Sequence, residues 1–176
     1  MTERVIIAGA GGQGIMLLGK ILAEAAMHEN KYVTWLPSYG AEVRGGTAHC
    51  MVVISDKEIG SPFVDLADSL IIMNAPSLEK FKKRIKKQGL LIINGSLAPR
   101  YSGAKLQIAR HPFTDIAVRL GNIRVANMVA LGCLLANKGL VSLESVFKVI
   151  QEIAPQDKKG LIGINQQAVK EGVSLK

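Results

Sequence analysis

Four glycines near the start of the chain are the residues best suited to bind a ligand. Gly9, Gly11, Gly12 and Gly14 follow a short β-branched run at 5–8 and precede an apolar helical pattern. Glycine leaves the backbone amides at a helix N-terminus open to an anion, and the helix dipole favours negative charge there. We therefore expect strand, tight turn and helix, with a phosphate or pyrophosphate at the turn. The alternative is that the glycines only let the helix pack closely on a sheet.

The spacing of Gly9, Gly11 and Gly14 also matches the dinucleotide-binding fingerprint. That fold normally carries an acidic residue about 20 residues beyond the glycines, which holds the ribose hydroxyls. The second strand expected here, at 31–36, ends at Trp35 and Leu36 and is followed by Pro37, with no Asp or Glu at that place. Either the adenosine is held differently or the ligand is not a dinucleotide.

A second candidate site is the polar, glycine-bearing stretch at 37–50, which we expect to be a loop at the carboxyl end of the second strand. A guanidinium and exposed backbone amides can converge on one phosphate or carboxylate. Ligands of open α/β sheets bind at this edge. The candidate contacts are Ser38, Arg44, Gly45, Gly46 and Thr47. The alternative is that Arg44 pairs with Glu42 or another carboxylate and that the glycines only make turns.

Two further polar residues lie next to expected strands. Asn74 follows the buried run at 69–73 and precedes Pro76, so it is either a ligand contact at a strand's carboxyl edge or a helix cap. His49 lies within an apolar pattern, and we interpret it as a packed or hydrogen-bonded histidine. No nearby serine or cysteine arrangement supports nucleophilic catalysis. We therefore assign no catalytic residue to this chain.

The elements that position these residues alternate between strands and helices. We expect strands at 5–8, 31–36, 48–54, 69–73, 89–94 and 105–109. We expect helices at 15–28, 76–87, 113–121, 125–137 and 143–153, the last capped by Ser142, and a short helix with a frayed tail at 165–176. The pattern predicts the α/β class, with one Rossmann-like, doubly wound, mostly parallel sheet and flanking helices. The first strand, helix and second strand should form a parallel, right-handed β-α-β unit.

The helix expected at 125–137 is apolar on nearly all sides. Such a helix must be buried. It therefore either packs on the sheet under another helix or forms a subunit interface, through which isolated chains could self-associate.

Length and composition favour one globular domain, residues 1–176. Hydrophobic residues make up 48% and charged residues 20%, and no apolar run is long enough to span a bilayer. The first residues, MTERVII, lack the pattern of a secretory signal, so we expect a cytoplasmic protein. Cys50 and Cys133 lie far apart in apolar runs and are interpreted as buried thiols, and we expect no metal site.

The formal net charge is +8, and six of the eight residues at 80–87 are basic. We interpret this run as the solvated face of an amphipathic helix. No nucleic-acid-binding motif accompanies it, and aromatic residues are 5% of the chain. The sequence therefore does not favour nucleic acid as a partner.

Three stretches together resemble the gamma subunit of the 2-oxoacid:ferredoxin oxidoreductases. They are GAGGQGIMLLGKILAEAA, WLPSYGAEVRGGTAHCMVVIS with the following IGSPFVD, and NMVALGCLLA. The sequence looks most like the separate gamma subunit of the 2-oxoglutarate enzyme, with the branched-chain and pyruvate enzymes as near neighbours.

The resemblance implies an assembly that oxidatively decarboxylates a 2-oxo acid, makes an acyl-coenzyme A and passes electrons to ferredoxin. It implies alpha, beta and in some cases delta partner subunits, which hold the thiamine diphosphate and the iron–sulfur clusters. Coenzyme A would bind at or near this chain. Its phosphates would contact Gly11, Gly12, Gln13 and Gly14 in one region, and Arg44, Gly45, Gly46 and Thr47 in a second region or at a subunit interface.

Two other functions remain open from the sequence. The chain could be a free-standing nucleotide-binding oxidoreductase, against which the missing acidic residue counts. It could also be a scaffold module without a ligand, in which the glycines and the Arg44 loop serve packing alone.

Overall fold

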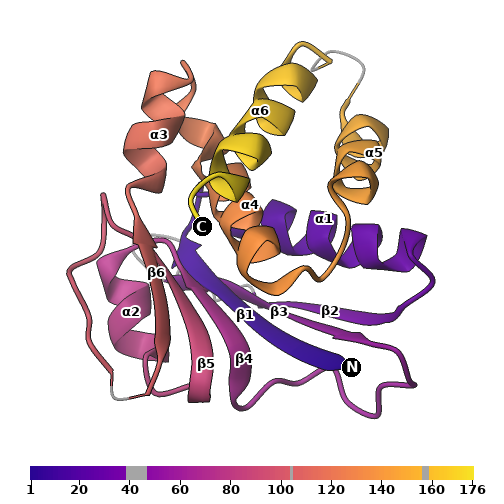
Figure 1. The fold of residues 1–176 in the computed structure, drawn as a ribbon, viewed down its shortest axis with the longest axis vertical. Coiled ribbons are helices and arrows are strands. Elements are labelled where there is room, and N and C mark those ends of the chain that lie inside the picture. The colour runs from indigo at the N-terminus through magenta and orange to yellow at the C-terminus, as the bar shows by residue number, and fades with distance from the viewer. Residues whose placement is uncertain (39–46, 104, 156–158) are drawn as a thin grey trace.

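The chain folds around one six-stranded sheet with helices on both faces (Figure 1). The computed structural model describes residues 1–38, 47–103, 105–155 and 159–176. The strands are β1 (Thr2–Ala10), β2 (Tyr32–Ser38), β3 (Thr47–Ser55), β4 (Ala67–Ile72), β5 (Ile85–Asn94) and β6 (Gln107–His111). The helices are α1 (Ile15–His28), α2 (Ala75–Phe81), α3 (Phe113–Arg119), α4 (Ala126–Lys138), α5 (Leu143–Ile153) and α6 (Leu161–Val173), with a short 3-10 turn, η1 (Ile123–Val125), before α4.

The strand order is β2-β3-β1-β4-β5-β6. Pairing is parallel from β1 through β4 and β5 to β6, whereas β3 is antiparallel to both β1 and β2. Strands β1 and β2 therefore run in the same direction, as the sequence predicts, but β3 lies between them. The expected α/β class with one mostly parallel sheet is confirmed.

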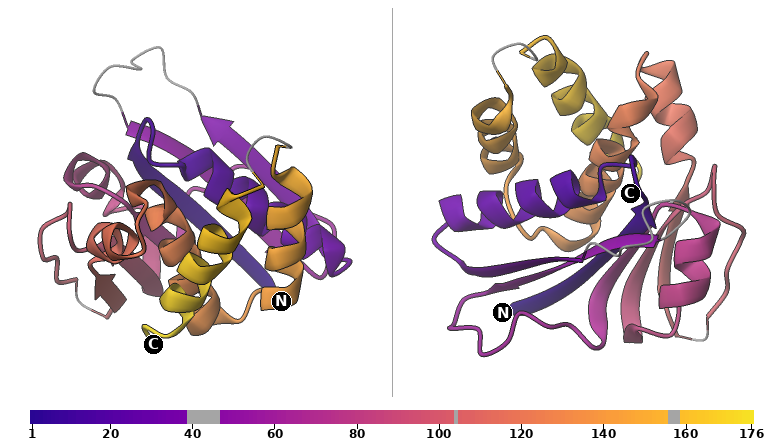
Figure 2. Two further views of the ribbon diagram at one scale, coloured as in Figure 1. Left: turned by 90° about the horizontal axis from the view of Figure 1, so that it is seen from above. Right: turned by 180° about the vertical axis from the view of Figure 1, so that it is seen from behind.

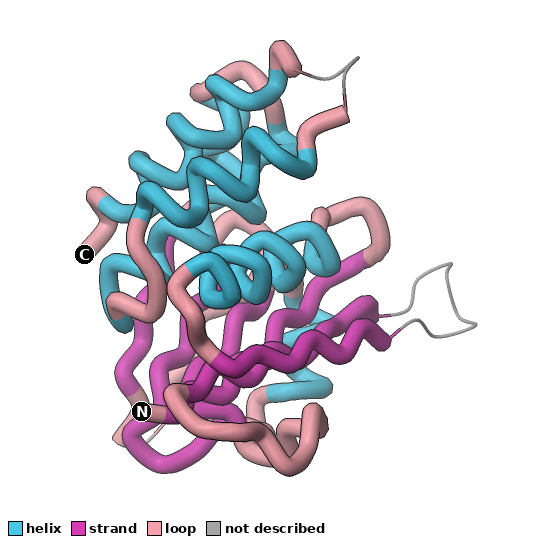
Figure 3. Tube along the Cα trace, turned by 90° about the vertical axis from the view of Figure 1, so that its right-hand side faces the viewer, coloured by secondary structure: helices cyan, strands magenta, loops and turns pink. Residues whose placement is uncertain are grey.

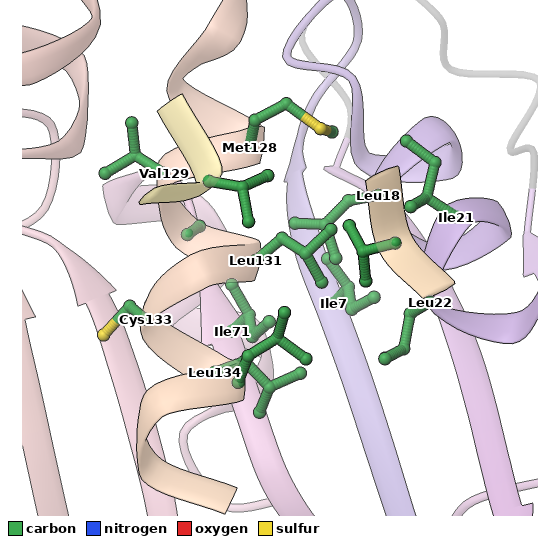
Figure 4. Close-up of a cluster of buried hydrophobic side chains, with 14 of the residues drawn as sticks. Ile7, Leu18, Ile21, Leu22, Ile71, Met128, Val129, Leu131, Cys133 and Leu134 are labelled. Carbon is green, nitrogen blue, oxygen red and sulfur yellow. The ribbon is translucent and has the colours of Figure 1, made fainter. Parts of the chain in front are cut away.

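The two faces of the sheet bury two separate apolar clusters, because side chains alternate along each strand. Helices α1, α3, α4, α5 and α6 pack on one face, and α2 covers part of the other (Figure 2). Figure 4 shows the centre of the larger cluster, where Leu18 and Leu22 of α1 approach Ile7 of β1 and Leu131 of α4.

Helix α4 is the most deeply buried of the described helices, with ten consecutive buried residues. It packs against α6 and β5. The sequence left open whether this helix packs on the sheet under another helix or forms a subunit interface, and the structure shows the first arrangement. The crossing with α6 is tight at Gly132 and Gly172. A Cβ on Gly132 would lie 2.1 Å from the carbonyl oxygen of Val169, and one on Gly172 would lie 2.0 Å from that of Val129. Only glycine fits at either position.

The basic run at 80–87 is not one helix, so that prediction is wrong. Helix α2 ends at Phe81, residues 82–84 form a turn, and Ile85 begins β5 by pairing with Ala67. Arg84 stabilises this turn by donating hydrogen bonds to the carbonyl oxygens of Val64 and Asp65. Apolar residues spaced three or four apart are compatible with a helix, but here Ile85 pairs with β4 and belongs to a strand.

The C-terminal segment also differs from expectation. Helix α6 starts at Leu161 and has 13 residues, so it is longer than the short helix predicted at 165–176. Helix α5 agrees with prediction, since the Ser142 hydroxyl accepts from the Ser145 amide at its start. Within the described ranges, no helix combines the length and hydropathy that a bilayer crossing requires.

Candidate anion-binding site

The carboxyl edge of the sheet brings the two predicted binding segments together. Strand β1 ends at Ala10, immediately before the glycine turn, and Ala10 pairs with Thr47, the first residue of β3. Ser38 ends β2 and pairs with His49. Figure 3 shows β2 and β3 side by side. Because Ser38 ends β2 and Thr47 begins β3, both residues lie at the same end of the sheet as the turn. Arg44, Gly45 and Gly46 lie outside the described residues.

The glycine turn is exposed at its tip and tightly packed at its base. Gly12 and Gly14 have φ values of +85° and +70°, in the left-handed region that favours glycine. Gly11 and Gly12 are exposed, and a Cβ on either would meet nothing within 4 Å. Gly9, in contrast, leaves room for the Gln13 side chain, whose Oε1 would lie 2.6 Å from a Cβ. The tip can therefore approach a ligand, while Gly9 serves packing.

Gln13 points into the protein rather than towards the open edge. Its Oε1 accepts from the Ala10 amide at 2.7 Å, and its Nε2 donates to the Met73 carbonyl at 3.3 Å. Its own amide donates to the Ala10 carbonyl at 3.2 Å. Gln13 thus closes the turn and joins it to the end of β4, and in this arrangement its polar groups are already used.

Asn127 is a site residue that sequence analysis missed. It is 2% exposed, and its Nδ2 donates to the Gly14 carbonyl at 3.0 Å while its Oδ1 accepts from the Met128 amide at 2.9 Å. A Cβ on Gly14 would lie 2.3 Å from this Nδ2. The sequence offers one indication of its role, because Asn127 is a polar residue at the start of the apolar stretch NMVALGCLLA. Asn127 fixes the turn from the side of α4.

Helix α1 begins directly after the turn, and its N-cap is Gly14. No side chain among the described residues caps this helix, and its first turn carries no acidic residue. The free amides of such a helix start and its dipole both favour an anion. The start of α1 and the exposed tip at Gly11 and Gly12 therefore lie next to each other at the carboxyl end of β1.

Thr47 and His49 lie on the face of the sheet that α2 covers. The Lys80 ammonium donates to the Thr47 hydroxyl at 2.9 Å. The His49 ring packs on Phe81, with 4.8 Å between ring centroids. Burial lowers the pKa of His49, and the positive charges of Lys80 and Arg84 lower it further. Both effects favour the neutral form of His49, and its ring is packed, as the sequence predicts.

Two asparagines at strand ends have structural roles. The Asn74 Oδ1 accepts from the Ser77 amide at 3.0 Å and so caps α2, which is one of the two roles expected for it. Asn94 is fully buried at the end of β5. Its Nδ2 donates to the Met73 carbonyl and the Thr114 hydroxyl, and its Oδ1 accepts from the amides of Ser96 and Thr114. Asn94 joins β4, β5 and the start of α3.

The two cysteines are buried free thiols, as expected. Burial raises the pKa of Cys50 to about 12 and that of Cys133 to about 11. Iron–sulfur clusters are held by about four cysteine thiolates, so this chain alone does not fit one. Within the described residues, no three histidine, cysteine or acidic side chains gather as metal ligands.

Fold and site together define an α/β protein with a candidate anion site at the carboxyl edge of its sheet and no nucleophilic or metal-binding cluster within the described residues. The family described as pyruvate ferredoxin/flavodoxin oxidoreductase matches residues 4–175, and the chain belongs to this family.

The chain is similar to subunits of several 2-oxo acid oxidoreductases. Ketoisovalerate oxidoreductase subunit VorA of Methanothermobacter thermautotrophicus is 38% identical over 170 residues, which are 96% of this chain and 35% of VorA. The chain thus spans about a third of that relative's length. The 2-oxoglutarate synthase subunit KorC of Methanocaldococcus jannaschii is 34% identical over 172 residues, which cover 94% of this chain and 92% of KorC.

Two solved structures share the fold. The gamma subunit of a keto/oxoacid ferredoxin oxidoreductase from Geobacter sulfurreducens has a TM-score of 0.85 and 29% identity, and covers 98% of this chain and 97% of its own. A 2-oxoglutarate:ferredoxin oxidoreductase from Magnetococcus marinus, with 2-oxoglutarate, coenzyme A and succinyl-CoA bound, has a TM-score of 0.90 and 24% identity, over 99% of this chain and 31% of that chain. The second likeness concerns the fold alone.

Proposed function

We propose that this chain, acting as one domain of residues 1–176, is the gamma subunit of a 2-oxoglutarate:ferredoxin oxidoreductase and contributes to coenzyme A binding and assembly. The carrying observation is the pairing of Ala10 with Thr47, which joins the ends of both predicted anion-binding segments at one sheet edge. The KorC relative, similar over nearly its whole length, supports the subunit type and the 2-oxo acid. The bound coenzyme A of the Magnetococcus enzyme supports the ligand.

In this proposal the chain binds and orients but does not carry out the redox steps. Thiamine diphosphate and the iron–sulfur clusters belong to the alpha, beta and, where present, delta partner subunits, and ferredoxin receives the electrons there. Those groups supply decarboxylation and electron transfer. The amides of Gly11 and Gly12 and the start of α1 hold one phosphate region of coenzyme A. Arg44, Gly45, Gly46 and Thr47 hold the second region or contact the thiamine-bearing subunits, with Ser38 and Asn74 at the margin.

The site explains why this chain would need partners for activity. The described residues present anion contacts but offer neither an ionised thiolate nor a neighbouring base and nucleophile. The isolated chain is therefore expected to be inactive and to bind coenzyme A only weakly, because a single open edge leaves most of such a ligand in solvent.

The test is the exchange of Arg44→Ala in the reconstituted complex. Loss of a charge-assisted contact from a desolvated site costs about 1.5–3 kcal/mol, so the KM for coenzyme A should rise about tenfold to a hundredfold. Arg100→Ala is the matched control. Arg100 is exposed in the segment between β5 and β6, and β6 is the edge strand on the other side of the sheet from β2 and β3. Ferredoxin reduction should be fastest with 2-oxoglutarate when ketoisovalerate and pyruvate are compared.

Other results would reassign the site. Unchanged KM and kcat for Arg44→Ala would contradict a role for this loop in coenzyme A binding. Loss of assembly with unaltered binding would make the loop an interface, as in a scaffold module. Binding of a nicotinamide or flavin nucleotide by the isolated chain would favour a free-standing oxidoreductase instead.

A further inference from the structure

Lys80 differs from three of the other basic residues of the run at 80–87 in the groups that it contacts. Lys82 pairs with Glu79, Lys86 pairs with Asp68, and Arg84 donates to two backbone carbonyls. Lys80 instead extends from α2 to the first residue of β3 and donates to the neutral Thr47 hydroxyl at 2.9 Å. Among the ion pairs of the described residues, none involves Lys80. Its charge is therefore not neutralised by the part of the chain that the structure describes.

The position of Lys80 is set by the sheet. Thr47 is paired directly with Ala10, the residue before the glycine turn. Directly opposite residues of an antiparallel pair have Cα atoms about 5 Å apart. The Lys80 ammonium thus lies on the α2 side of the edge, and the glycine turn with the start of α1 lies on the other. A ligand laid across this edge can reach both.

The surroundings of the ammonium favour an anion. The Phe81 ring centroid lies 5.6 Å from Nζ, and the neutral His49 ring packs on the same phenyl group. An ammonium has three N–H donors, of which the Thr47 hydroxyl takes one. The remaining donors, next to an apolar wall and a neutral ring, have room for phosphate oxygens.

We infer that Lys80 is a further binding residue of the same edge, and that it donates to a phosphate group of the ligand from the α2 side. This inference rests on the proposed coenzyme A function and adds a contact that neither the glycine turn nor the Arg44 loop supplies. The ligand class is a phosphorylated, polyanionic nucleotide derivative that spans both faces of the sheet edge.

The test compares Lys80→Gln with Lys83→Gln in the reconstituted complex, using coenzyme A as the probe in titration calorimetry. Lys83 is exposed in the turn after α2, so both changes remove one positive charge from the same run. Lys80→Gln should weaken binding about tenfold, and Lys83→Gln should leave it within twofold. Lys80→Arg keeps the charge and should recover part of the affinity.

The pKa of His49 provides a second measurement. It would not respond to coenzyme A if Lys80 had only a structural role. A phosphate next to Lys80 offsets its positive charge, so adding coenzyme A should raise the pKa of His49 in an NMR titration of the full chain. The change should be absent in Lys80→Gln. Dephospho-coenzyme A, which lacks the 3′-phosphate, shows which phosphate is held. An equal loss with both ligands assigns Lys80 to the diphosphate, and a loss with coenzyme A alone assigns it to the 3′-phosphate.

The experiments distinguish a failure of the proposed function from a failure of the role of Lys80. If the wild-type complex does not bind coenzyme A, both the proposed function and this inference are wrong. If it binds and Lys80→Gln matches Lys83→Gln, only the role of Lys80 is overturned. A lowered melting temperature for Lys80→Gln with unchanged coenzyme A affinity would show that the contact with Thr47 only ties α2 to β3.

Discussion

Asn127 and Gly14 form a contact between two segments more than a hundred residues apart. The Asn127 side chain donates to the Gly14 carbonyl and accepts from the Met128 amide, which lies in the first turn of α4. Asn127 and Met128 are buried, so water cannot readily replace the partner of the Met128 amide. The shape of the exposed tip therefore depends on a residue that does not reach the ligand edge itself.

Replacing Asn127 by Ala should lower the free energy of unfolding by about 1–3 kcal/mol, because it leaves the Met128 amide unpaired and opens a small cavity. Urea denaturation measures this change. Asn165→Ala is the control, since that side chain donates to the Leu161 carbonyl of its own helix at the surface, and its effect should stay below about 0.5 kcal/mol. Equal effects of the two substitutions would contradict a role for Asn127 in bracing the turn.

At the residue scale, the types of the site residues could be predicted but not their directions. The glycines with positive φ, the Ser142 cap and the cap by Asn74 follow from local preferences that the sequence displays. The inward orientation of Gln13 does not, because it depends on Met73 at the end of β4. Lys80 reaches Thr47 only because α2 and β3 are neighbours in the tertiary structure.

Helix α4 crosses α6 so closely that glycine is required at the contact. Adding a methyl group at Gly132 would place it 2.1 Å from the Val169 carbonyl oxygen and 2.9 Å from the Cα of Gly172. Both neighbours are backbone atoms, so neither helix can relieve the clash by rotating a side chain. The helices would have to separate along the whole crossing.

Gly132→Ala should therefore destabilise the protein by about 2–3 kcal/mol, even though Ala favours a helix by about 1 kcal/mol over Gly. Gly163→Ala is the matched substitution within α6, where a Cβ meets nothing within 4 Å. It should stabilise the protein by about 0.5–1 kcal/mol. Thermal or urea unfolding of both variants measures the difference, and a stabilising Gly132→Ala would show that the helices are not in contact there.

At the element scale, long periodic segments such as α1, α4 and α5 could be predicted, because an apolar face at helical spacing persists over several turns. The run at 80–87 could not, since two apolar residues among six basic ones fit both a helix and a turn followed by a strand. The pairing of Ile85 with Ala67 decides between them. The antiparallel insertion of β3 was missed for a related reason: strand order depends on long-range pairing, not on local pattern.

At the scale of the whole molecule, the two cysteines report on whether the larger core opens. Cys50 lies on β3 against α1. Cys133 lies on α4 in the same apolar cluster, as Figure 4 shows. Both thiols are inaccessible, and burial keeps their pKa values at about 12 and about 11. Since the thiolate is the reactive form, both should resist modification in the native protein.

We expect a thiol reagent at pH 8 to modify Cys50 and Cys133 of the isolated chain at one shared slow rate, set by global unfolding. Both should react rapidly in denaturant, and mass spectrometry identifies the modified residue. Gly132→Ala should accelerate both equally, because it destabilises the core as a whole. Fast labelling of Cys133 alone in native buffer would mean that α6 separates from α4 while the sheet stays folded. The apolar surface of α4 would then be available for self-association, whereas equal slow rates mean that any self-association uses another surface.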